Sequence, residues 1–327
     1  MIKISKGKNE SNAIVNLSSL ALEHYERLVN SSTGFKSPLE VLKEERVVHN
    51  NNRDLKGQFL SKVTKEQEFK RIVTADLNEI EQIKSDYQRF RNLFTNGNYK
   101  HYVKLFGYDR FRKSKAGFVF ANGLGVKVCL YCNQNYTLTI AKSSRALCHF
   151  DHFYSKDKYP FLAVCYYNLV PCCAVCNTIK SNKDFVKGEF IHPYEESLAN
   201  LFKFETDKKI VLKMILNGNK ALEGLTIKLK HKAGFKRLLA NHLEVFKLDA
   251  VYNEHKDIVS DIYSKSLIYN KSRLEELEGI NPGLFNKSEI EKLVLGNYVL
   301  KSQINQRPHA KFMRDIGHES GLLKKWR

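Results

Sequence analysis

The spacing of apolar positions predicts helices along the first third of the chain. From Phe69 to Phe94, apolar residues recur every three or four positions, in a stretch that contains neither Gly nor Pro. This is the period of an amphipathic helix, and Thr64–Gln67 has the sequence of a capping box at its start. We expect one long helix ended by Asn96-Gly97, whose apolar face packs on the rest of the chain or docks a partner.

A second helix start lies earlier in the chain. The run Ser37-Pro38-Leu39-Glu40 combines an N-cap Ser, a Pro at the first helical position and a Glu at the third, so a helix should extend to about Arg46. On the long helix, basic residues alternate with acidic ones, so we interpret its polar face as solvated; the basic members are Lys65, Lys70, Arg71, Lys84, Arg89 and Arg91.

The pattern changes to short β-type stretches between Val126 and His152. The segments VKVCL, YTLTI and RALCHF alternate or are rich in β-branched residues, which predicts short antiparallel strands. Asp151 and His152 would end the last strand. A short helix around 161–167 should then lead to Asn168, and a helix should run on from Asn177.

The last third of the chain mixes strands and helices. LFKFET and KIVLKMIL are typical of strands, with Asp207-Lys208-Lys209 between them, and LEGLTIKLKHK predicts a third. An amphipathic helix should begin near Asp249, with an apolar face formed by Val251, Ile258, Val259, Ile262 and Ile268. The expected fold is therefore α+β in three regions: a helical region at 1–120, a central module at 121–195 and a strand-plus-helix region at 196–327.

Two Cys-x-x-C pairs predict a metal site in the central module. The pairs are Cys129/Cys132 and Cys173/Cys176, separated by a long insertion. This is the ligand spacing of a four-thiolate zinc site, which leaves no open coordination position and is therefore structural. A redox dithiol is the less favoured alternative, because it would not need a second pair. Cys172 could replace Cys173 only at a spacing of three, and Cys148 and Cys165 are interpreted as small core residues.

The segment between the cysteines resembles a known family. DHFYSKDKYPFLAVCYYNLVPCCAVCN, which starts at Asp151, is similar to HNH nucleases of the ββα-metal group, in which such zinc pairs bracket the active site. The resemblance makes Asp151 a metal ligand, His152 the general base and Asn168 a brace whose amide bonds backbone across the loop. Asn177 takes the place of the family's final His as the second metal ligand.

This resemblance implies a one-metal nuclease. The carboxylate of Asp151 and the amide oxygen of Asn177 are hard ligands that suit Mg²⁺ or Mn²⁺. His152, neutral near pH 7, would take a proton from the water that attacks a phosphodiester. The resemblance implies DNA as the favoured substrate, and RNA such as tRNA is the alternative. A non-catalytic zinc module that binds nucleic acid or scaffolds a partner is the competing hypothesis.

Wider features look like the HNH subunit of Septu-type bacterial anti-phage systems. They include KVCLYCNQNY, IHPYEE, VYNEHKDIV and RDIGHESGL, from about Lys127 to the C-terminus. The resemblance implies an ATPase partner in a defence complex, and the chain itself lacks a GxxxxGK[ST] motif. It also implies the bacterial cytoplasm, in agreement with the clustered cysteines and with the absence of a signal-like N-terminus or a membrane-spanning apolar run. Oligomerisation stays open.

The net charge of +19 at pH 7 indicates an acidic partner, with nucleic acid first. Candidate phosphate contacts lie just after Asn177 and in a basic stretch further on: Lys180, Lys183, Lys228, Lys230, Lys232, Lys236 and Arg237. A second basic set comprises Arg307, Lys311, Arg314, Lys324, Lys325 and Arg327. Solvated surface is an equally good interpretation of both sets.

Overall fold

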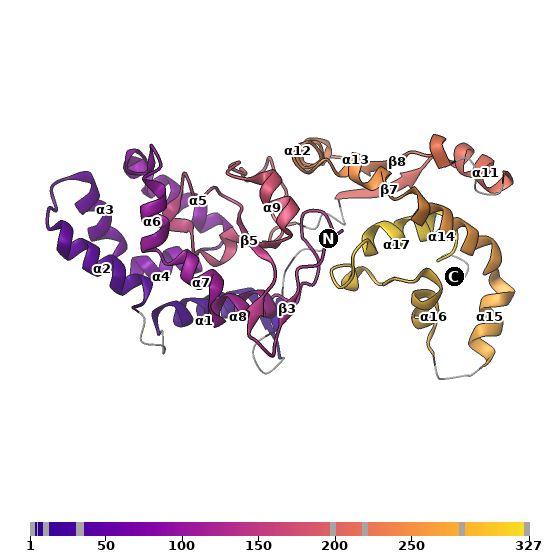
Figure 1. The fold of residues 1–327 in the computed structure, drawn as a ribbon, viewed down its shortest axis with the longest axis horizontal. Helices are drawn as coiled ribbons and strands as arrows, with labels where there is room; N and C mark the ends of the chain where they lie inside the picture. The colour runs from indigo at the N-terminus through magenta and orange to yellow at the C-terminus, as the bar shows by residue number, and fades with distance from the viewer. Residues whose placement is uncertain are drawn as a thin grey trace. The chain divides into compact units, whose positions relative to one another are not determined.

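The protein folds as a mixed α+β structure, as predicted, with many helices and small antiparallel strand pairs (Figure 1). This computed structural model describes residue 4 and residues 6–8, 13–30, 36–196, 201–217, 222–280 and 285–323. The chain forms two compact units. We call residues 4–126 with 137–187 the N-terminal unit, and residues 127–136 with 188–327 the C-terminal unit. The structure thus groups the predicted helical region with most of the central module.

The N-terminal unit gathers its helices around a short hairpin (Figure 1). Its helices are α1 (Leu17–Val29), α2 (Pro38–His49), α3 (Leu55–Val63), α4 (Glu66–Thr74), α5 (Leu77–Asp86), α6 (Tyr99–Leu105), α7 (Tyr108–Lys113), α8 (Lys115–Gly123) and α9 (Ala174–Lys180). The 3₁₀ segments are η1 (Gln88–Phe94), η2 (Pro160–Leu162) and η3 (Tyr166–Asn168). Antiparallel pairs join β1 (Lys6–Lys8) to β2 (Ile14–Asn16), β3 (Thr139–Ile140) to β4 (Arg145–Ala146), and β5 (His149–His152) to β6 (Leu169–Cys172).

The prediction of one long helix over 65–95 is wrong, because the chain breaks it into α4, α5 and η1. The break falls at Ala75-Asp76, where the Asp76 carboxylate accepts hydrogen bonds from the backbone N–H groups of Asn78 and Glu79 at 2.8 and 2.9 Å. Thr64 does not cap α4, since its hydroxyl donates to the carbonyl of Leu60. The apolar stripe itself is buried in the unit, which supports packing over docking.

The predicted start of α2 is confirmed. Ser37 Oγ accepts from the Glu40 N–H at 3.2 Å, and Glu40 Oε2 accepts from the Ser37 N–H at 2.6 Å, which is the reciprocal capping box. The helix continues to His49, beyond the expected end at Arg46.

The hairpin of β5 and β6 lies at the centre of this unit. Its register pairs Asp151 with Val170 and His152 with Leu169. From α7, the Tyr108 hydroxyl donates to the Phe150 carbonyl at 2.7 Å. The predicted helix at 161–167 is wrong: proline starts the short turn η2, and η3 follows after a break.

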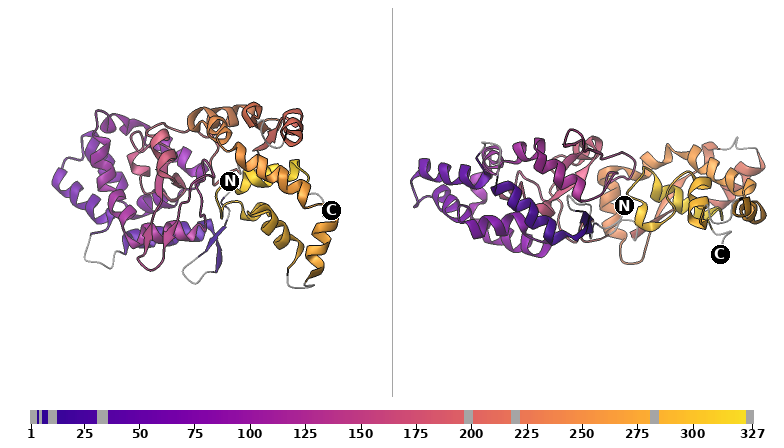
Figure 2. Two further views of the ribbon diagram at one scale, coloured as in Figure 1. Left: turned by 45° about the vertical axis from the view of Figure 1, so that its right-hand side comes forward. Right: turned by 90° about the horizontal axis from the view of Figure 1, so that it is seen from below.

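The described residues of the C-terminal unit form a two-stranded sheet (Figure 1) and a set of helices (Figure 2). The strands predicted at LFKFET and LEGLTIKLKHK form as β7 (Phe202–Thr206) and β8 (Ile227–His231), and the structure pairs them antiparallel. The helices are α11 (Lys208–Leu216), α12 (Lys236–Phe246), α13 (Leu248–Asn253), α14 (Lys256–Ile268), α15 (Lys271–Ile280), α16 (Lys287–Leu295) and α17 (Ala310–Glu319), with 3₁₀ segments η4 (Leu222–Gly224) and η5 (Lys301–Gln303). VKVCL is not a strand; it contributes only a bridge between Val128 and Tyr136.

Two further predictions for this unit need correction. KIVLKMIL forms α11 and not a strand, because the Asp207 carboxylate caps the N–H groups that start a helix. The helix expected from Asp249 is two helices, α13 and α14. Of its expected apolar face, Val259 and Ile262 are buried, whereas Val251 and Ile268 are exposed.

Helix α17 supplies acceptors to strand β7. The Phe204 N–H donates to Asp315 Oδ2 at 3.1 Å, and the Thr206 N–H donates to Glu319 at 3.0 Å. These bonds satisfy strand donors that β8 does not reach.

Within the part of the chain described, no helix has both the length and the apolar character needed to cross a membrane.

Candidate functional site

The hairpin and helix α9 bring the predicted catalytic residues to one pocket of about 460 Å³. Asp151 and His152 end β5 and are 4% and 5% exposed, while Asn177 on α9 is half-buried. All three line this pocket, which we call the hairpin pocket. The β5–β6 hairpin and helix α9 therefore bring the side chains of Asp151 and His152 next to that of Asn177, although these residues are separated in the sequence.

The protonation state of His152 follows from its hydrogen bond. Its Nε2 atom lies 3.0 Å from the Ala163 carbonyl oxygen. A carbonyl can only accept, so Nε2 carries the proton and Nδ1 holds the free lone pair. Burial, with smaller effects of Lys156 and Lys180, lowers the pKa of His152 to about 3, opposed in part by the Ala163 bond. The imidazole is therefore neutral at physiological pH.

Asp151 is paired with a buried lysine. Lys180, the last residue of α9, is completely buried, and its Nζ lies 3.3 and 3.2 Å from the two carboxylate oxygens of Asp151. The same ammonium donates to the His152 carbonyl at 2.6 Å and lies over the Phe185 ring. Both interpretations of Lys180 made from the sequence, a phosphate clamp and a solvated face, are therefore wrong. Lys183 is exposed.

Asn168 bonds backbone across the loop, as expected. It is completely buried, and its Oδ1 accepts from the Tyr154 N–H at 2.8 Å. Its Nδ2 donates to the carbonyls of Tyr154 and Leu162 at 3.2 and 3.1 Å. The amide thus ties the segment that follows His152 to the turn that carries Ala163, the partner of the imidazole.

Asn177 contacts a histidine from the neighbouring strand. Its Nδ2 lies 3.5 Å from His149 Nδ1, and the Cys172 thiol lies 3.9 Å from its Oδ1. Burial lowers the pKa of His149, with a further lowering from the positive charge of Arg112. His149 therefore contacts Asn177 and also lines the pocket.

The four cysteines that the sequence predicts as metal ligands lie close together. The sulfur atoms of Cys129, Cys132, Cys173 and Cys176 all lie within 4.8 Å of one another, and all four side chains are buried. Among the described residues this is the one group of three or more His, Cys, Asp or Glu side chains placed to share a metal ion. Four thiol groups around a common centre fit Zn²⁺.

Backbone donors support this cluster. The Gln134 N–H donates to Cys132 Sγ and the Cys176 N–H donates to Cys173 Sγ, both at 3.4 Å. Such bonds stabilise the negative charge of a metal-binding thiolate. Cys172 lies outside the cluster, where burial raises its thiol pKa well above the usual value. Buried Cys148 and Cys165, with pKa values raised by burial to about 12, are core residues as expected.

Two cations of the hairpin pocket were not expected from the sequence. Arg112 on α7 and Lys156 in the loop after β5 both line the pocket, and neither forms an ion pair within the described part of the chain. Lys156 lies 5.1 Å from the centre of the Tyr108 ring. Arg112 precedes the module by some distance and has no motif around it, so only the fold reveals it.

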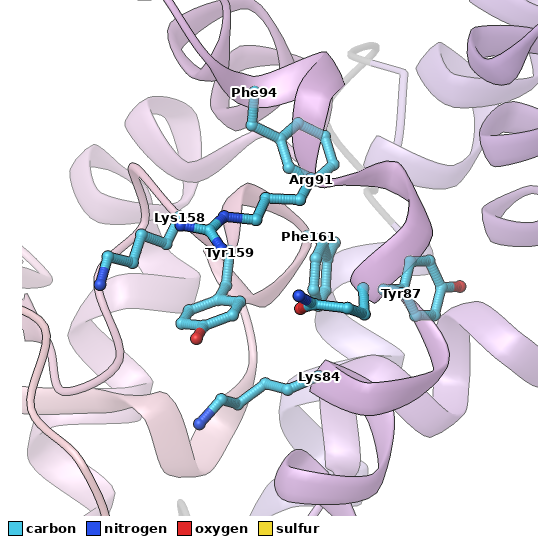
Figure 3. Close-up of a pocket in the computed structure, with 8 residues that line it drawn as sticks. Lys84, Tyr87, Arg91, Phe94, Lys158, Tyr159 and Phe161 are labelled. Carbon is cyan, nitrogen blue, oxygen red and sulfur yellow. The ribbon is translucent and has the colours of Figure 1, made fainter.

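The same loop contributes to a smaller pocket of about 90 Å³, shown in Figure 3. Lys84 and Arg91 extend toward the Tyr159 ring, and Lys158 is the third basic residue of the lining. Lys84 Nζ lies 5.1 Å from the ring centre and is paired with Glu81. Lys84 and Arg91 belong to the face interpreted as solvated, and here they border an aromatic hollow.

The basic residues of the C-terminal unit have mixed surroundings. The set Lys228, Lys230, Lys232, Lys236 and Arg237 is exposed. Lys230 and Arg237 are paired with Glu205 and Glu189, at 3.4 and 2.7 Å. Lys311 is buried and paired with Asp315, so it is not a surface phosphate contact. Lys324, Lys325 and Arg327 lie outside the described residues.

Arg307 and Arg314, the remaining members of the second basic set, donate to backbone carbonyls at Gly296 and Val299.

Comparison with known proteins gives no family assignment: no family model matches the sequence, and no curated protein or solved structure matches it. The geometry of the hairpin pocket and the cysteine cluster is therefore the basis for a functional proposal.

Proposed function

We propose that this chain is a metal-dependent HNH-type endonuclease that hydrolyses phosphodiester bonds, with DNA as the favoured substrate. The observation that carries the proposal is the convergence of Asp151, His152 and Asn177 on one pocket, with the tautomer of His152 set by Ala163. The order β5, β6, α9 is the order of a ββα-metal motif, and the cysteine cluster lies on the segments that bracket it. The resemblance of the sequence to HNH nucleases points to the same three residues and to the same cysteine pairs.

The base chemistry depends on Nδ1 of His152. With its proton on Nε2, the imidazole presents Nδ1 as an acceptor for a proton from water. The low pKa keeps this acceptor free at neutral pH but makes it a weak base in the protein alone. Asn168 holds the backbone around the Ala163 carbonyl, so it maintains the tautomer that the reaction needs. Arg112 and Lys156 give the pocket the positive charge that an anionic phosphate requires.

The donors present fit a hard divalent ion. Asp151 and Asn177 supply oxygen atoms beside the same pocket, and they are the residues that would hold Mg²⁺ or Mn²⁺. When bound there, such an ion supplies charge neutralisation at the phosphate and its leaving oxygen. Because Lys180 already contacts both oxygens of Asp151, the ion would share this carboxylate, and we expect modest affinity.

The proposed setting is a bacterial defence complex in which an ATPase partner controls the nuclease. Support comes from the sequence resemblance to Septu HNH subunits and from the high positive charge of the chain. An RNA substrate such as tRNA is the nearest alternative, because a single imidazole and one divalent ion do not distinguish ribose from deoxyribose.

The test is cleavage by the purified full chain. It should be incubated with duplex DNA, single-stranded DNA and tRNA, with Mg²⁺ or Mn²⁺, alone and with its ATPase partner. His152→Ala should abolish cleavage and retain nucleic-acid binding, since a lost general base costs about 10²–10⁴-fold in rate. Lys142→Ala, on an exposed turn, is the matched control and should cleave normally. Equal cleavage by wild type and His152→Ala would exclude this mechanism.

A non-catalytic zinc module that binds nucleic acid is the second candidate. The exposed basic residues on β8 and α12 favour it as strongly as they favour a nuclease. It predicts binding without cleavage for wild type and for His152→Ala alike, whatever divalent ion or partner is added.

A further inference from the structure

A second large pocket in the N-terminal unit has no role in the proposed hydrolysis. It has a volume of about 550 Å³ and is bordered by the end of α1, the start of α2, and α7 with the start of α8. Five basic side chains line it, and no Asp or Glu is among its lining residues: Arg27, Lys36, Arg110, Lys113 and Lys115. We call it the basic pocket.

Part of this positive charge has no acidic partner. Arg27 is paired with Glu23 at 2.8 Å and Lys36 with Glu44 at 2.6 Å. By contrast, Arg110, Lys113 and Lys115 form no ion pair with any carboxylate of the described residues. Three uncompensated cations beside one hollow create a field that favours an anion of more than one charge.

The floor of the basic pocket is apolar. Leu28, Pro38 and Phe111 are buried residues that line it. The close approach of α7 to α2 shapes this floor: Gly107 has φ of +71°, and a Cβ atom there would lie 2.9 Å from Pro38 Cγ. The volume lies within the range of about 300–1,000 Å³ that is usual for small-molecule sites and exceeds the need of a single inorganic anion.

The basic pocket is separate from the hairpin pocket, although both use α7. Arg110, Phe111 and Lys113 line the basic pocket, whereas Tyr108 and Arg112 line the hairpin pocket. No residue lines both. A ligand in the basic pocket would therefore contact the same helix as the nuclease substrate without competing for its groups.

We propose that the basic pocket binds a nucleotide through its phosphate groups, with the base or sugar on the floor formed by Leu28, Pro38 and Phe111. The uncompensated cations match a di- or triphosphate, and the apolar floor matches an aromatic ring. A free nucleoside polyphosphate and the 5′-phosphorylated end of a nucleic-acid strand offer this same chemistry. The proposal does not depend on phosphodiester hydrolysis.

The test is calorimetric titration of the full, zinc-loaded chain without added Mg²⁺. The probes are adenosine diphosphate, inorganic phosphate, adenosine, and one DNA oligonucleotide with either a 5′-phosphate or a 5′-hydroxyl. We expect adenosine diphosphate to bind at least about tenfold more tightly than inorganic phosphate or adenosine, because each of these two uses only the cations or only the floor. Arg110→Ala and Lys115→Ala should each weaken its binding about tenfold, the usual loss for one charged hydrogen bond.

The test includes one control variant and one substitute pocket variant. Lys142→Ala removes an exposed lysine elsewhere on the same unit and should change binding less than about twofold. Lys113→Ala, at another exposed lining residue, replaces Arg110→Ala if the latter lowers the melting temperature. Tighter binding of the 5′-phosphorylated oligonucleotide, lost in the same variants, would identify a strand end as the source; binding of adenosine diphosphate alone would identify a free nucleotide. The proposal is overturned if adenosine diphosphate binds no better than inorganic phosphate, or if the pocket variants bind as wild type does.

Discussion

Replacing Lys180 by Met tests the ion pair at the centre of the hairpin pocket. The substitution keeps the length of the side chain and removes its charge, so Asp151 stays in its buried position without the ammonium. The His152 carbonyl loses its 2.6 Å bond to Lys180 at the same time. Lys180→Met should therefore lower the free energy of unfolding by about 3–5 kcal/mol, the usual cost of removing one partner of a buried ion pair.

The magnitude is large enough to measure and to separate from packing. A domain has a total stability of about 5–15 kcal/mol, so this variant would unfold at a clearly lower urea concentration. Adding Asp151→Asn to Lys180→Met removes the second charge and should restore a large part of the loss, since a pair replaced on both sides is often tolerated. Lys183→Met, at an exposed position, is the control and should change stability by less than about 0.5 kcal/mol.

Urea unfolding followed by circular dichroism, with and without Mn²⁺, is the assay. In Lys180→Met, the Asp151 carboxylate is no longer shared, so Mn²⁺ should bind more tightly than in wild type and recover more stability. A loss below about 1 kcal/mol for Lys180→Met, or a double variant no more stable than the single one, would refute the importance of the pair. Equal Mn²⁺ affinity in both proteins would show that Asp151 does not bind the ion.

Three other predictions concern the zinc site, the loop brace and a buried histidine. Cys176→Ser, or removal of metal by a chelator, should lower the temperature of thermal unfolding, because four buried thiolates need the ion. Metal analysis should find that about one Zn²⁺ per chain is released. A chain that holds no zinc and is unaffected by chelation would contradict the site. Asn168→Ala should cost about 2–4 kcal/mol in urea unfolding, since it removes three hydrogen bonds to buried backbone groups of Tyr154 and Leu162. A loss as small as that of a surface substitution would mean that the loop holds without the amide. Burial lowers the pKa of His24 to about 4 in the folded protein, below its value of about 6.5 in the unfolded chain. The free energy of unfolding should therefore be unaffected by this group above about pH 6.5 and should fall by about 3 kcal/mol as the pH drops toward 4. His24→Gln should flatten this part of the curve of unfolding free energy against pH, and an unchanged slope would argue against burial of a neutral imidazole.

Sequence rules gave correct predictions where the pattern of residue types itself specifies the partners. The capping box at Ser37 and Glu40 closes within four residues, and it forms as predicted. The two Cys-x-x-C pairs need only a common centre, and their sulfurs have one. β5 ends with Asp151 and His152, as the β-type stretch before them predicts.

Stretches whose patterns allow two outcomes were decided by their surroundings. KIVLKMIL is apolar enough for a strand, but a cap at Asp207 and the burial of Val211 and Met214 on one face make it helical, with Leu212 and Leu216 exposed. The apolar residues of the long periodic stretch from Phe69 are buried as its pattern predicts, but a cap at Asp76 divides the stretch into separate helices. Each of these helices packs its own apolar side on the core.

The sequence by itself determined the chemistry that is available: four cysteines spaced for one ion, and an Asp-His pair with two asparagines in a fixed order. Only the tertiary structure decided the charges around that chemistry. It buried Lys180 against Asp151 and placed Arg112 at the same pocket. The physical reason is range: caps and ligand pairs act over a few residues, whereas burial and electrostatic pairing depend on segments that meet only when the chain has folded.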